Sequence, residues 1–210
     1  MRKYELTSET KVINGVKLHR IKALKSFRSI EKGDLGGWIE SEKNLSQDGD
    51  AWVFDNAKVR GNATIRGDAW VFDNAEVSGN AMVYDNATVG GDAWVCGKAM
   101  VYGDATVGGY TFISGNATVE DKAGVYGNAT VSGNAKVSRD ADYIVFKNWW
   151  SSGRYFTWTR SNNKWEVGCF YGSGEELIAK AYKDSAKSGR EYERIVNYVE
   201  YILKEENNNK

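Results

Sequence analysis

The chain has 210 residues, of which 41% are hydrophobic, enough to bury the core of one large domain or two small ones. Lys and Arg balance Asp and Glu at 28 each, so the protein as a whole lacks the basic footprint that duplex DNA binding needs. Because no apolar run resembles a signal peptide or reaches the ~18 residues of a membrane span, we expect a folded cytoplasmic protein that contacts no membrane.

Residues 1–44 are predicted to form an N-terminal β cap. In the stretch KVINGVKL, apolar and basic residues flank Asn14 and Gly15 on both sides. Asn-Gly is a dipeptide typical of a two-residue hairpin turn. The stretch GDLGGWIES follows, and Ile39 and Leu45 anticipate the spacing of the repeat beyond it. We therefore expect this segment to begin or cap the first coil, because the end of a stacked β structure exposes unpaired strand edges.

The middle of the chain is a repeat. The nonapeptide GDAWVFDNA occurs at 49–57 and again at 67–75, eighteen residues apart. From Ala51 to Ala141 an Ala falls at every sixth position, replaced once by Thr111, and from Val53 to Val137 an aliphatic residue stands two positions after each of them. Residues six positions apart do not lie on one face of an α-helix. The alternation of inward Ala and aliphatic residues with other residues between them is typical of a short, half-buried β-strand.

The two remaining places of each hexad are nearly always Gly-Asn, Gly-Asp or Asp-Asn, which tolerate the left-handed backbone of a tight corner. Three strands and three corners return the chain to its start after eighteen residues, so each coil stacks on the one before. The prediction is a mostly β protein in which residues 45–141 form a triangular parallel β-helix of about five coils, with Ala and Val inside.

The hexad V-x-G-N-A-x, as at Val131–Lys136, resembles the hexapeptide repeat of left-handed β-helix proteins, over nearly half of the chain. The resemblance implies a left-handed helix. The best-known members of that family are acyltransferases that use acyl-CoA or acyl carrier protein, usually as trimers, with a catalytic His at a subunit boundary. Here the repeat contains no His, and His19 lies outside it. His19 is therefore the one candidate base, although a surface or cap residue is the simpler interpretation.

Outward positions of the predicted helix sort into three faces, and each face carries a local apolar cluster. The clusters are Trp52, Phe54, Trp70 and Phe72 on the first face, Trp94 and Phe112 on the second, and Met82, Tyr84, Met100 and Tyr102 on the third. Solvated surfaces seldom gather large aromatic side chains in this way. Three interpretations stay open: the terminal regions fold over the clusters, the clusters form the interface of a homotrimer or dimer, or they line a substrate groove.

Residues 142–210 are predicted to form a small α+β module. The stretches YIVFKNWW, RYFTWTR and KWEVGCFY are expected as three strands. Two helices follow, each begun by a capping box, Ser173 with Glu176 and Ser188 with Glu191.

The predicted strands of this module hold basic residues among aromatic ones, and these are the candidate ligand or partner contacts: Lys147, Trp149, Trp150, Arg154, Tyr155, Trp158, Arg160, Lys164 and Trp165. Cations between rings suit stacking on a base while a phosphate is neutralised. The alternative is that the rings are the core of a small sheet under two helices, with the basic residues at its rim.

The cap, the hexads and the terminal module together resemble uncharacterised hexapeptide-repeat proteins of phages and prophages, which implies a viral protein in the host cytoplasm and interference with a host defence process. Cys96 and Cys169 are isolated thiols, and no catalytic triad, metal cluster or Walker-type loop appears. The favoured function is a non-enzymatic, cofactor-free, oligomeric scaffold whose C-terminal module binds a host protein or a nucleotide-like ligand. The alternatives are a hexapeptide-class acyltransferase and a structural component.

Overall fold

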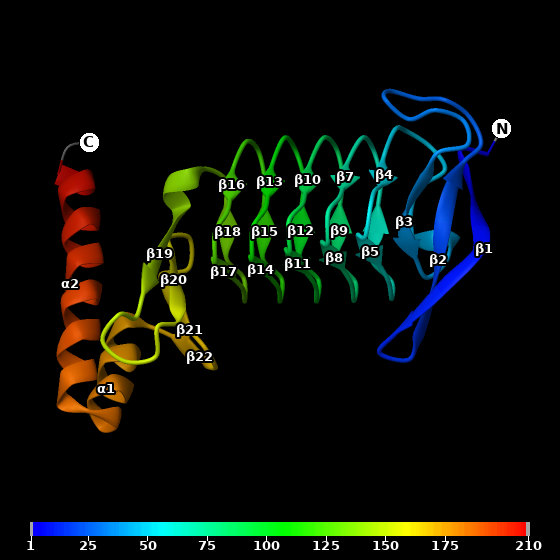
Figure 1. The fold of residues 1–210 in the computed structure, drawn as a ribbon. Helices are drawn as coiled ribbons and strands as arrows, with labels where there is room; N and C mark the ends of the chain where they lie inside the picture. Colours follow the sequence, from blue (N-terminus) through cyan, green and yellow to red (C-terminus); the bar gives the residue numbers. More distant parts are fainter. Residues whose placement is uncertain (1, 209–210) are drawn as a thin grey trace.

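The protein, seen in a computed structural model that describes residues 2–208, is a straight β rod with a cap at each end (Figure 1). The N-terminal cap contains β1 (Tyr4–Ile13), β2 (Val16–Ala23), β3 (Leu35–Ile39) and the short 3-10 helix η1 (Glu42–Asn44). The C-terminal module contains η2 (Asp140–Asp142), β19 (Tyr143–Lys147), β20 (Tyr155–Thr159), β21 (Lys164–Val167), β22 (Phe170–Gly172), α1 (Gly174–Asp184) and α2 (Ala186–Asn208).

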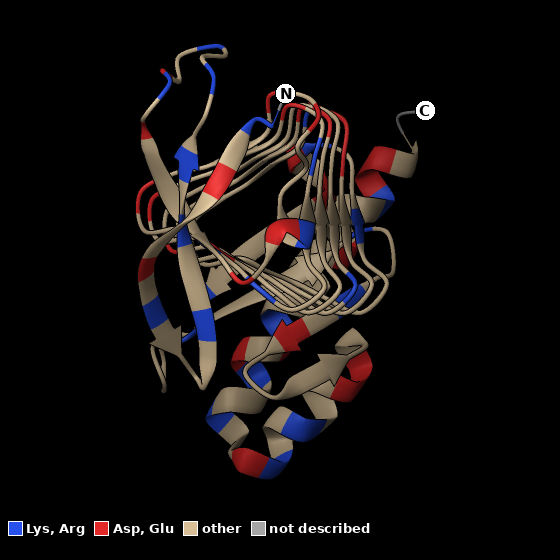
Figure 2. Cartoon of the chain, turned by 90° about the vertical axis from the view of Figure 1, so that its right-hand side faces the viewer, with Lys and Arg blue, Asp and Glu red and all other residues tan. Residues whose placement is uncertain are grey.

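Two-residue strands make up the rod between these ends: β4 (Trp52–Val53), β5 (Lys58–Val59), β6 (Thr64–Ile65), β7 (Trp70–Val71), β8 (Glu76–Val77), β9 (Met82–Val83), β10 (Thr88–Val89), β11 (Trp94–Val95), β12 (Met100–Val101), β13 (Thr106–Val107), β14 (Phe112–Ile113), β15 (Thr118–Val119), β16 (Gly124–Val125), β17 (Thr130–Val131) and β18 (Lys136–Val137). Viewed along its length from the N-terminal side, the rod is a triangle (Figure 2). The first face has the strand order β16-β13-β10-β7-β4 and the third face β18-β15-β12-β9-β6. The second face continues into the cap, as β1-β2-β3-β5-β8-β11-β14-β17.

The predicted hexad register is confirmed, because the Ala and aliphatic residues of the hexads are buried along the whole rod. Each strand pairs with its counterpart in the next coil, as Trp52 does with Trp70 and Thr88 with Thr106. Val89, in the middle of the rod, has no exposed surface. Strand β3 pairs in parallel with β5, so the rod has about six turns rather than the five expected.

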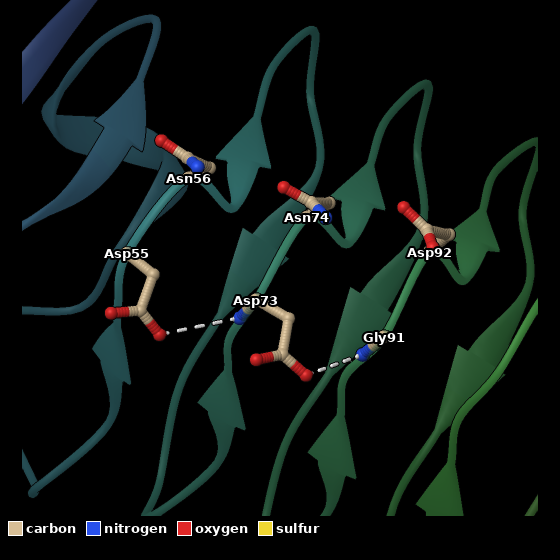
Figure 3. Close-up of a pocket in the computed structure, with 6 residues that line it drawn as sticks. All are labelled: Asp55, Asn56, Asp73, Asn74, Gly91 and Asp92. Carbon is tan, nitrogen blue, oxygen red and sulfur yellow. Dashed lines mark hydrogen bonds between the residues drawn. The ribbon is translucent and has the colours of Figure 1, made fainter.

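The corners use two kinds of residue in the left-handed region of φ. At Gly67 a Cβ would lie 2.9 Å from the backbone nitrogen of Asp85, so the stacking of coils leaves little room for a side chain. Asp55 and Asp73 adopt the same conformation at φ 49° and 57° and turn their carboxylates along the rod. Asp55 accepts from the Asp73 N–H at 3.4 Å and Asp73 from the Gly91 N–H at 2.9 Å (Figure 3). The carboxylate thereby links one coil to the next.

Backbone hydrogen bonds give the rod a direction. The N–H groups of the ladder donate to carbonyls of the next coil, as Trp52 N–H does to Ala69 at 3.0 Å. The first coil therefore presents carbonyl oxygens that no earlier coil can satisfy. The cap supplies donors: Lys3 Nζ donates to Gly49 O at 3.2 Å and to Ala51 O at 2.9 Å.

Tyr4 is the second donor at this end, since its hydroxyl donates to the Leu45 carbonyl at 2.6 Å. The rings of Tyr4 and Phe27 meet Trp52 edge-on, with centroids 6.2 and 5.4 Å away. Burial raises the pKa of Tyr4 and lowers the pKa of Lys3 to about 8, because in each case it disfavours the charged form. The N-terminal region thus closes the rod with Lys3 and Tyr4, two buried polar side chains that donate to backbone carbonyls.

The last coil presents N–H groups instead, and here the chain supplies oxygen acceptors. Thr157 Oγ1 accepts from the Thr130 N–H at 2.8 Å, and Ser161 Oγ accepts from the Lys136 N–H at 2.7 Å. Further bonds of this kind run from the N–H groups of Gly124, Tyr126 and Ser138 to Asp140, the Tyr143 hydroxyl and Asp142, respectively. Side-chain oxygens therefore replace the carbonyls of a further coil.

The C-terminal module differs from its prediction in two places. Four strands form rather than three, because Gly168, at φ 59°, turns the chain between β21 and β22. The capping box of Ser173 with Glu176 is confirmed, with bonds of 2.7 and 3.2 Å. The second box is wrong: α2 begins before Ser188, whose N–H donates to the Ser185 hydroxyl at 3.0 Å. None of the helices within residues 2–208 has the length and apolar character needed to cross a membrane.

Candidate binding surface of the C-terminal module

Three of the nine predicted contact residues are core. Trp150, Trp158 and Trp165 are 8%, 1% and 2% exposed, and they pack with Phe156 and Tyr192 between the four-stranded sheet and the two helices. Strand alternation explains this, since Trp158 and Trp165 are opposite each other in the ladder and point to the helix side. These three rings are therefore removed from the candidate surface.

Two of the basic residues are engaged with other groups. Arg160 donates to Glu206 at 2.7 and 3.3 Å and to the Ala141 carbonyl at 3.2 Å, which joins α2 to the start of the module. Lys164 lies near Glu176, whose pKa is lowered first by the Ser173 N–H and further by the charge of Lys164. Arg160 is therefore engaged within the module, whereas Lys164 acts on Glu176 only through its charge.

The other four residues gather at the tip of the β19–β20 hairpin, residues 147–155, which we call the hairpin tip. Lys147 and Tyr155 are opposite each other in the ladder, and the Lys147 ammonium lies 5.5 Å from the Tyr155 ring centroid. Trp149 is 71% exposed and Tyr155 is 43% exposed. Arg154 is exposed too, and within residues 2–208 neither Lys147 nor Arg154 has a carboxylate partner. Exposed rings and unpaired cations therefore share one short loop.

The backbone of the hairpin tip is fixed by Asn148, which is 4% exposed. Its amide nitrogen donates to the Tyr192 hydroxyl at 3.0 Å, and its side-chain oxygen accepts from the N–H and hydroxyl of Ser151, both at 3.0 Å. The backbone closes the loop through Asn148 N–H to Arg154 O and Gly153 N–H to Asn148 O, each 2.8 Å. The tip is thus held in one conformation before any partner arrives.

A pocket of about 310 Å³ adjoins the hairpin tip. Arg154 and the serines of the tip form one wall, the Gly168–Cys169 turn forms another, and Asp184 and Ser188 line it from the junction of α1 and α2. Burial raises the pKa of Tyr192, at its floor, and Asp184 raises it further. The pocket combines one cation, one carboxylate and several hydroxyls, which suits a small polar molecule.

From the sequence, Lys147, Trp149 and Arg154 are predicted on two strands in which basic and aromatic residues mix. In the structure β19 ends at Lys147 and β20 begins at Tyr155, so Trp149 and Arg154 lie on the loop between the strands. Asn148, Asp184 and Ser188 were not identified from the sequence as lining residues of the pocket. The junction of α1 and α2 meets the hairpin tip only in the folded module, so residues far apart in the chain line one pocket.

On the rod, the predicted interface residues have different surroundings. Trp52 is covered by the cap of its own chain and is removed from the candidate interface. Phe54, Trp70 and Phe72 stay half-buried and line a hollow of about 280 Å³. On the second face Trp94 is 43% exposed and meets Phe112 edge-on at 5.4 Å.

The third face carries a continuous column of side chains. Arg66 lies 4.7 Å from the Tyr84 ring centroid, and Tyr84 stacks on Tyr102 with centroids 4.8 Å apart. The Tyr102 hydroxyl donates to Glu120, which raises the pKa of Tyr102 to about 12. Met82 and Met100 pair beside this column. Most of the column's polar groups are thus bonded to one another within the chain.

His19 lies on β2 of the cap, half-buried, with Nδ1 3.4 Å from the Thr7 carbonyl. The structure brings no second titratable group into hydrogen-bond contact with its ring among the described residues. The corner hollow of about 420 Å³ in Figure 3 is lined by Asp55, Asp73 and Asp92 with their Asn and Gly neighbours. Over residues 2–208 no group of three or more His, Cys, Asp or Glu side chains is arranged to hold a metal ion.

Known proteins match the rod. A family model described as the YdcK β-solenoid repeat matches residues 75–91, 83–97, 112–126 and 123–139. The rod resembles the YdcK β-solenoid. An uncharacterized acetyltransferase of Escherichia coli strain K12, YdcK, is 36% identical to this chain over 74 residues, a match that covers 31% of this chain and 23% of YdcK. The resemblance to hexapeptide-repeat β-helix proteins is therefore confirmed, while the chain spans less than a quarter of that relative.

Proposed function

We propose that this chain is a non-enzymatic binding protein, in which the rod is a rigid scaffold and the hairpin tip holds a nucleotide-like ligand. The observation that carries the proposal is the exposure of Lys147, Trp149, Arg154 and Tyr155 on one loop whose backbone is already fixed. A host protein that offers an acidic group beside a ring would engage the same side chains. The phage origin and the anti-defence role rest on the sequence resemblance and stay predictions.

The chemistry of the tip supports this ligand class. An exposed indole offers a stacking face worth roughly 1–3 kcal/mol per base, and a guanidinium nearby pairs with a phosphate in a charge-assisted hydrogen bond. Because Arg154 also lines the 310 Å³ pocket, a ring stacked on Trp149 and a phosphate held by Arg154 would lie on adjoining surfaces. A fixed loop loses little conformational entropy on binding.

The test is isothermal titration of the protein with a panel of nucleoside monophosphates and diphosphates. Trp149→Ala and Arg154→Ala are each expected to weaken binding about tenfold or more, with the melting temperature unchanged. Arg194→Ala is the matched control, an exposed arginine on α2 that pairs only with Glu191 in the described chain. Absence of nucleotide binding, or wild-type affinity in both tip variants, would contradict the proposal. Capture of a host protein that needs the same residues would indicate a protein partner in place of a nucleotide-like ligand.

Self-association of the rod is a further part of the proposal, as a dimer or trimer through the apolar clusters that the cap leaves uncovered. Phe54, Trp70 and Phe72 support it on the first face, and Met82 and Met100 on the third. Light scattering should give a mass above one chain for the wild type and a lower mass for Trp70→Lys or Met100→Lys. A monomeric wild type at micromolar concentration would contradict this part alone.

Acyl transfer is the second candidate, favoured by the name of the E. coli relative, which is called an acetyltransferase. His19 would be its base, and loss of a base typically lowers a rate by about 10²- to 10⁴-fold. Turnover of acetyl-CoA that disappears in His19→Ala but persists in Arg154→Ala would establish this candidate over ligand binding by the tip.

A further inference from the structure

At the N-terminal end of the second face, three cations from three strands meet around Trp38. Lys11 of β1 places its ammonium 4.1 Å from the indole centroid, and Arg20 of β2 places its guanidinium carbon 5.5 Å away. Lys58 of β5 is the neighbour of Trp38 in the parallel ladder. We call Lys11, Arg20 and Lys58 the cationic cluster. Figure 2 looks onto this end, where Lys and Arg recur along the two long strands of the cap.

Few carboxylates balance these charges. Glu9 pairs with Arg20 at 3.4 Å, and it is half exposed. Two more carboxylates lie on the same face and are bonded elsewhere: Glu40 accepts from the Gly61 N–H at 2.6 Å, and Glu76, the ladder neighbour of Lys58, pairs with Arg60 at 2.5 Å. Within residues 2–208 neither Lys11 nor Lys58 has an ion pair of its own.

The arrangement costs free energy in the unliganded chain. Burial, first, and the charges of Lys58 and Arg20 together lower the pKa of Lys11 to about 8, and the charge of Glu9 opposes them only in part. Trp38 is 8% exposed although it lies outside the rod core, and its indole N–H has no partner in the described chain. A cap that served only to close the rod would not need three mutually repelling cations on its side.

We infer that the cationic cluster around Trp38 binds a phosphate group, either free or on a phosphomonoester. A divalent oxyanion neutralises the positive charge of the cationic cluster that remains after Glu9 has paired with Arg20. It also accepts hydrogen bonds from an ammonium and a guanidinium at once, which a single carboxylate does less well. The site is at the opposite end of the rod from the hairpin tip, so it is independent of the function proposed above (Figure 1).

The test compares thermal stability in inorganic phosphate and in chloride at equal ionic strength and neutral pH. A bound anion stabilises the folded chain in proportion to its occupancy, so the wild type should melt higher in phosphate. Lys11→Gln and Lys58→Gln should each weaken phosphate binding about tenfold, the effect of one lost charge-assisted bond. In chloride, Lys11→Gln should melt at or above the wild-type temperature, because a repulsion has been removed.

Lys17→Gln is the matched control, because Lys17 is an exposed lysine of the same hairpin that lies outside the cluster. It should keep the full phosphate effect. A Lys11→Gln protein that melts lower in chloride and keeps the phosphate effect would overturn the inference, since Lys11 would then only cover the indole. No difference between phosphate and chloride in the wild type would overturn it as well.

Calorimetry gives a second measurement that a covering role would not change. Near pH 8 the bound anion should raise the pKa of Lys11, so binding takes up protons, and the observed enthalpy depends on the buffer in the wild type but not in Lys11→Gln. Titration with glycerol 3-phosphate distinguishes the two sources of the group. Tighter binding of the ester than of inorganic phosphate would indicate a phosphomonoester ligand, and equal binding would indicate free phosphate.

Discussion

The two ends of the rod expose opposite hydrogen-bonding groups, and the chain satisfies them with different side chains. The first coil exposes carbonyls, and Lys3 and Tyr4 donate to them. The last coil exposes N–H groups, and Thr157 and Ser161 accept from them. Most of the buried apolar residues of the N-terminal cap belong to the same hydrophobic core as the rod, whereas the C-terminal module has a core of its own.

This difference teaches that closing a β-helix does not require one kind of cap. At the N-terminus the cap is a continuation of the rod, with Tyr4, Ile21 and Ile30 in the rod core. At the C-terminus an independently cored module docks mainly through side-chain oxygens, although Tyr143 and Val145 also touch the rod core. We therefore expect damage to the first cap to unfold the rod, and damage to the second to stay local.

The largest predicted effect compares a ring removed at each end. Tyr4→Ala and Trp158→Ala should each cost about 3–5 kcal/mol, the usual range for a buried aromatic side chain replaced by Ala. Tyr4→Ala should lower the melting temperature of the rod in a single transition. Trp158→Ala should instead produce an early transition of the C-terminal module, with the rod melting later.

Differential scanning calorimetry measures the transitions, and limited proteolysis locates the part that opens first. An early cleavage after the hexads in Trp158→Ala, with the rod intact, is the expected pattern. A single transition at a lowered temperature in both variants would show that the two caps are equally coupled to the rod. It would contradict the expected difference between global unfolding from the N-terminal cap and local unfolding of the C-terminal module.

A smaller effect is expected from Thr157→Val, which keeps the side-chain shape and removes the acceptor of the Thr130 N–H. An unsatisfied buried donor costs about 1–3 kcal/mol, so docking of the module should weaken by that amount. Thr106→Val on the first face is the control, because its hydroxyl bonds only to Thr88 on a part-exposed surface. Hydrogen exchange at Thr130 should rise in the first variant alone, and unchanged exchange there would contradict the docking role of Thr157.

Lys3 gives the N-terminal cap a pH dependence. Its pKa is about 8 when folded and 10.5 in the unfolded chain, so the unfolded chain binds more protons between these values. The free energy of unfolding should therefore rise with pH in this interval, by about 1 kcal/mol from pH 8 to pH 9. Urea titrations of the wild type and Lys3→Met measure it, and the rise should be larger in the wild type by that amount. Parallel curves would show that Lys3 keeps its ordinary pKa.

The smallest effect is expected for Arg160→Ala in the C-terminal module. The ion pair with Glu206 is partly exposed, so its loss should cost about 0.5–1 kcal/mol of module stability. Ligand binding at the hairpin tip should be unchanged, because Arg160 is bonded to α2 and to Ala141 rather than left free. A loss of binding without a loss of stability would return Arg160 to the candidate site.

Local sequence rules predicted the parts of the fold that repeat or turn on neighbouring residues. The six-residue register, the Asn14-Gly15 hairpin and the Ser173 capping box are all confirmed. Each depends on residues a few positions apart, and the hexad signal is reinforced every time it recurs. The second capping box failed because Ser185, three residues earlier, offers the same hydroxyl to the helix start.

The sequence by itself determined that Lys147, Trp149 and Arg154 lie among the aromatic residues of the C-terminal module. It did not determine which rings are buried, because either side of a short amphipathic strand can face the helices, and only packing placed Trp158 and Trp165 inside. Nor did it show Lys11, Arg20 and Lys58 around Trp38. Lys58 is far from Lys11 and Arg20 in the chain, and it meets them because the antiparallel cap continues the second face of the rod in parallel register. A repeat thus specifies its own stacking, whereas its ends depend on contacts between distant segments.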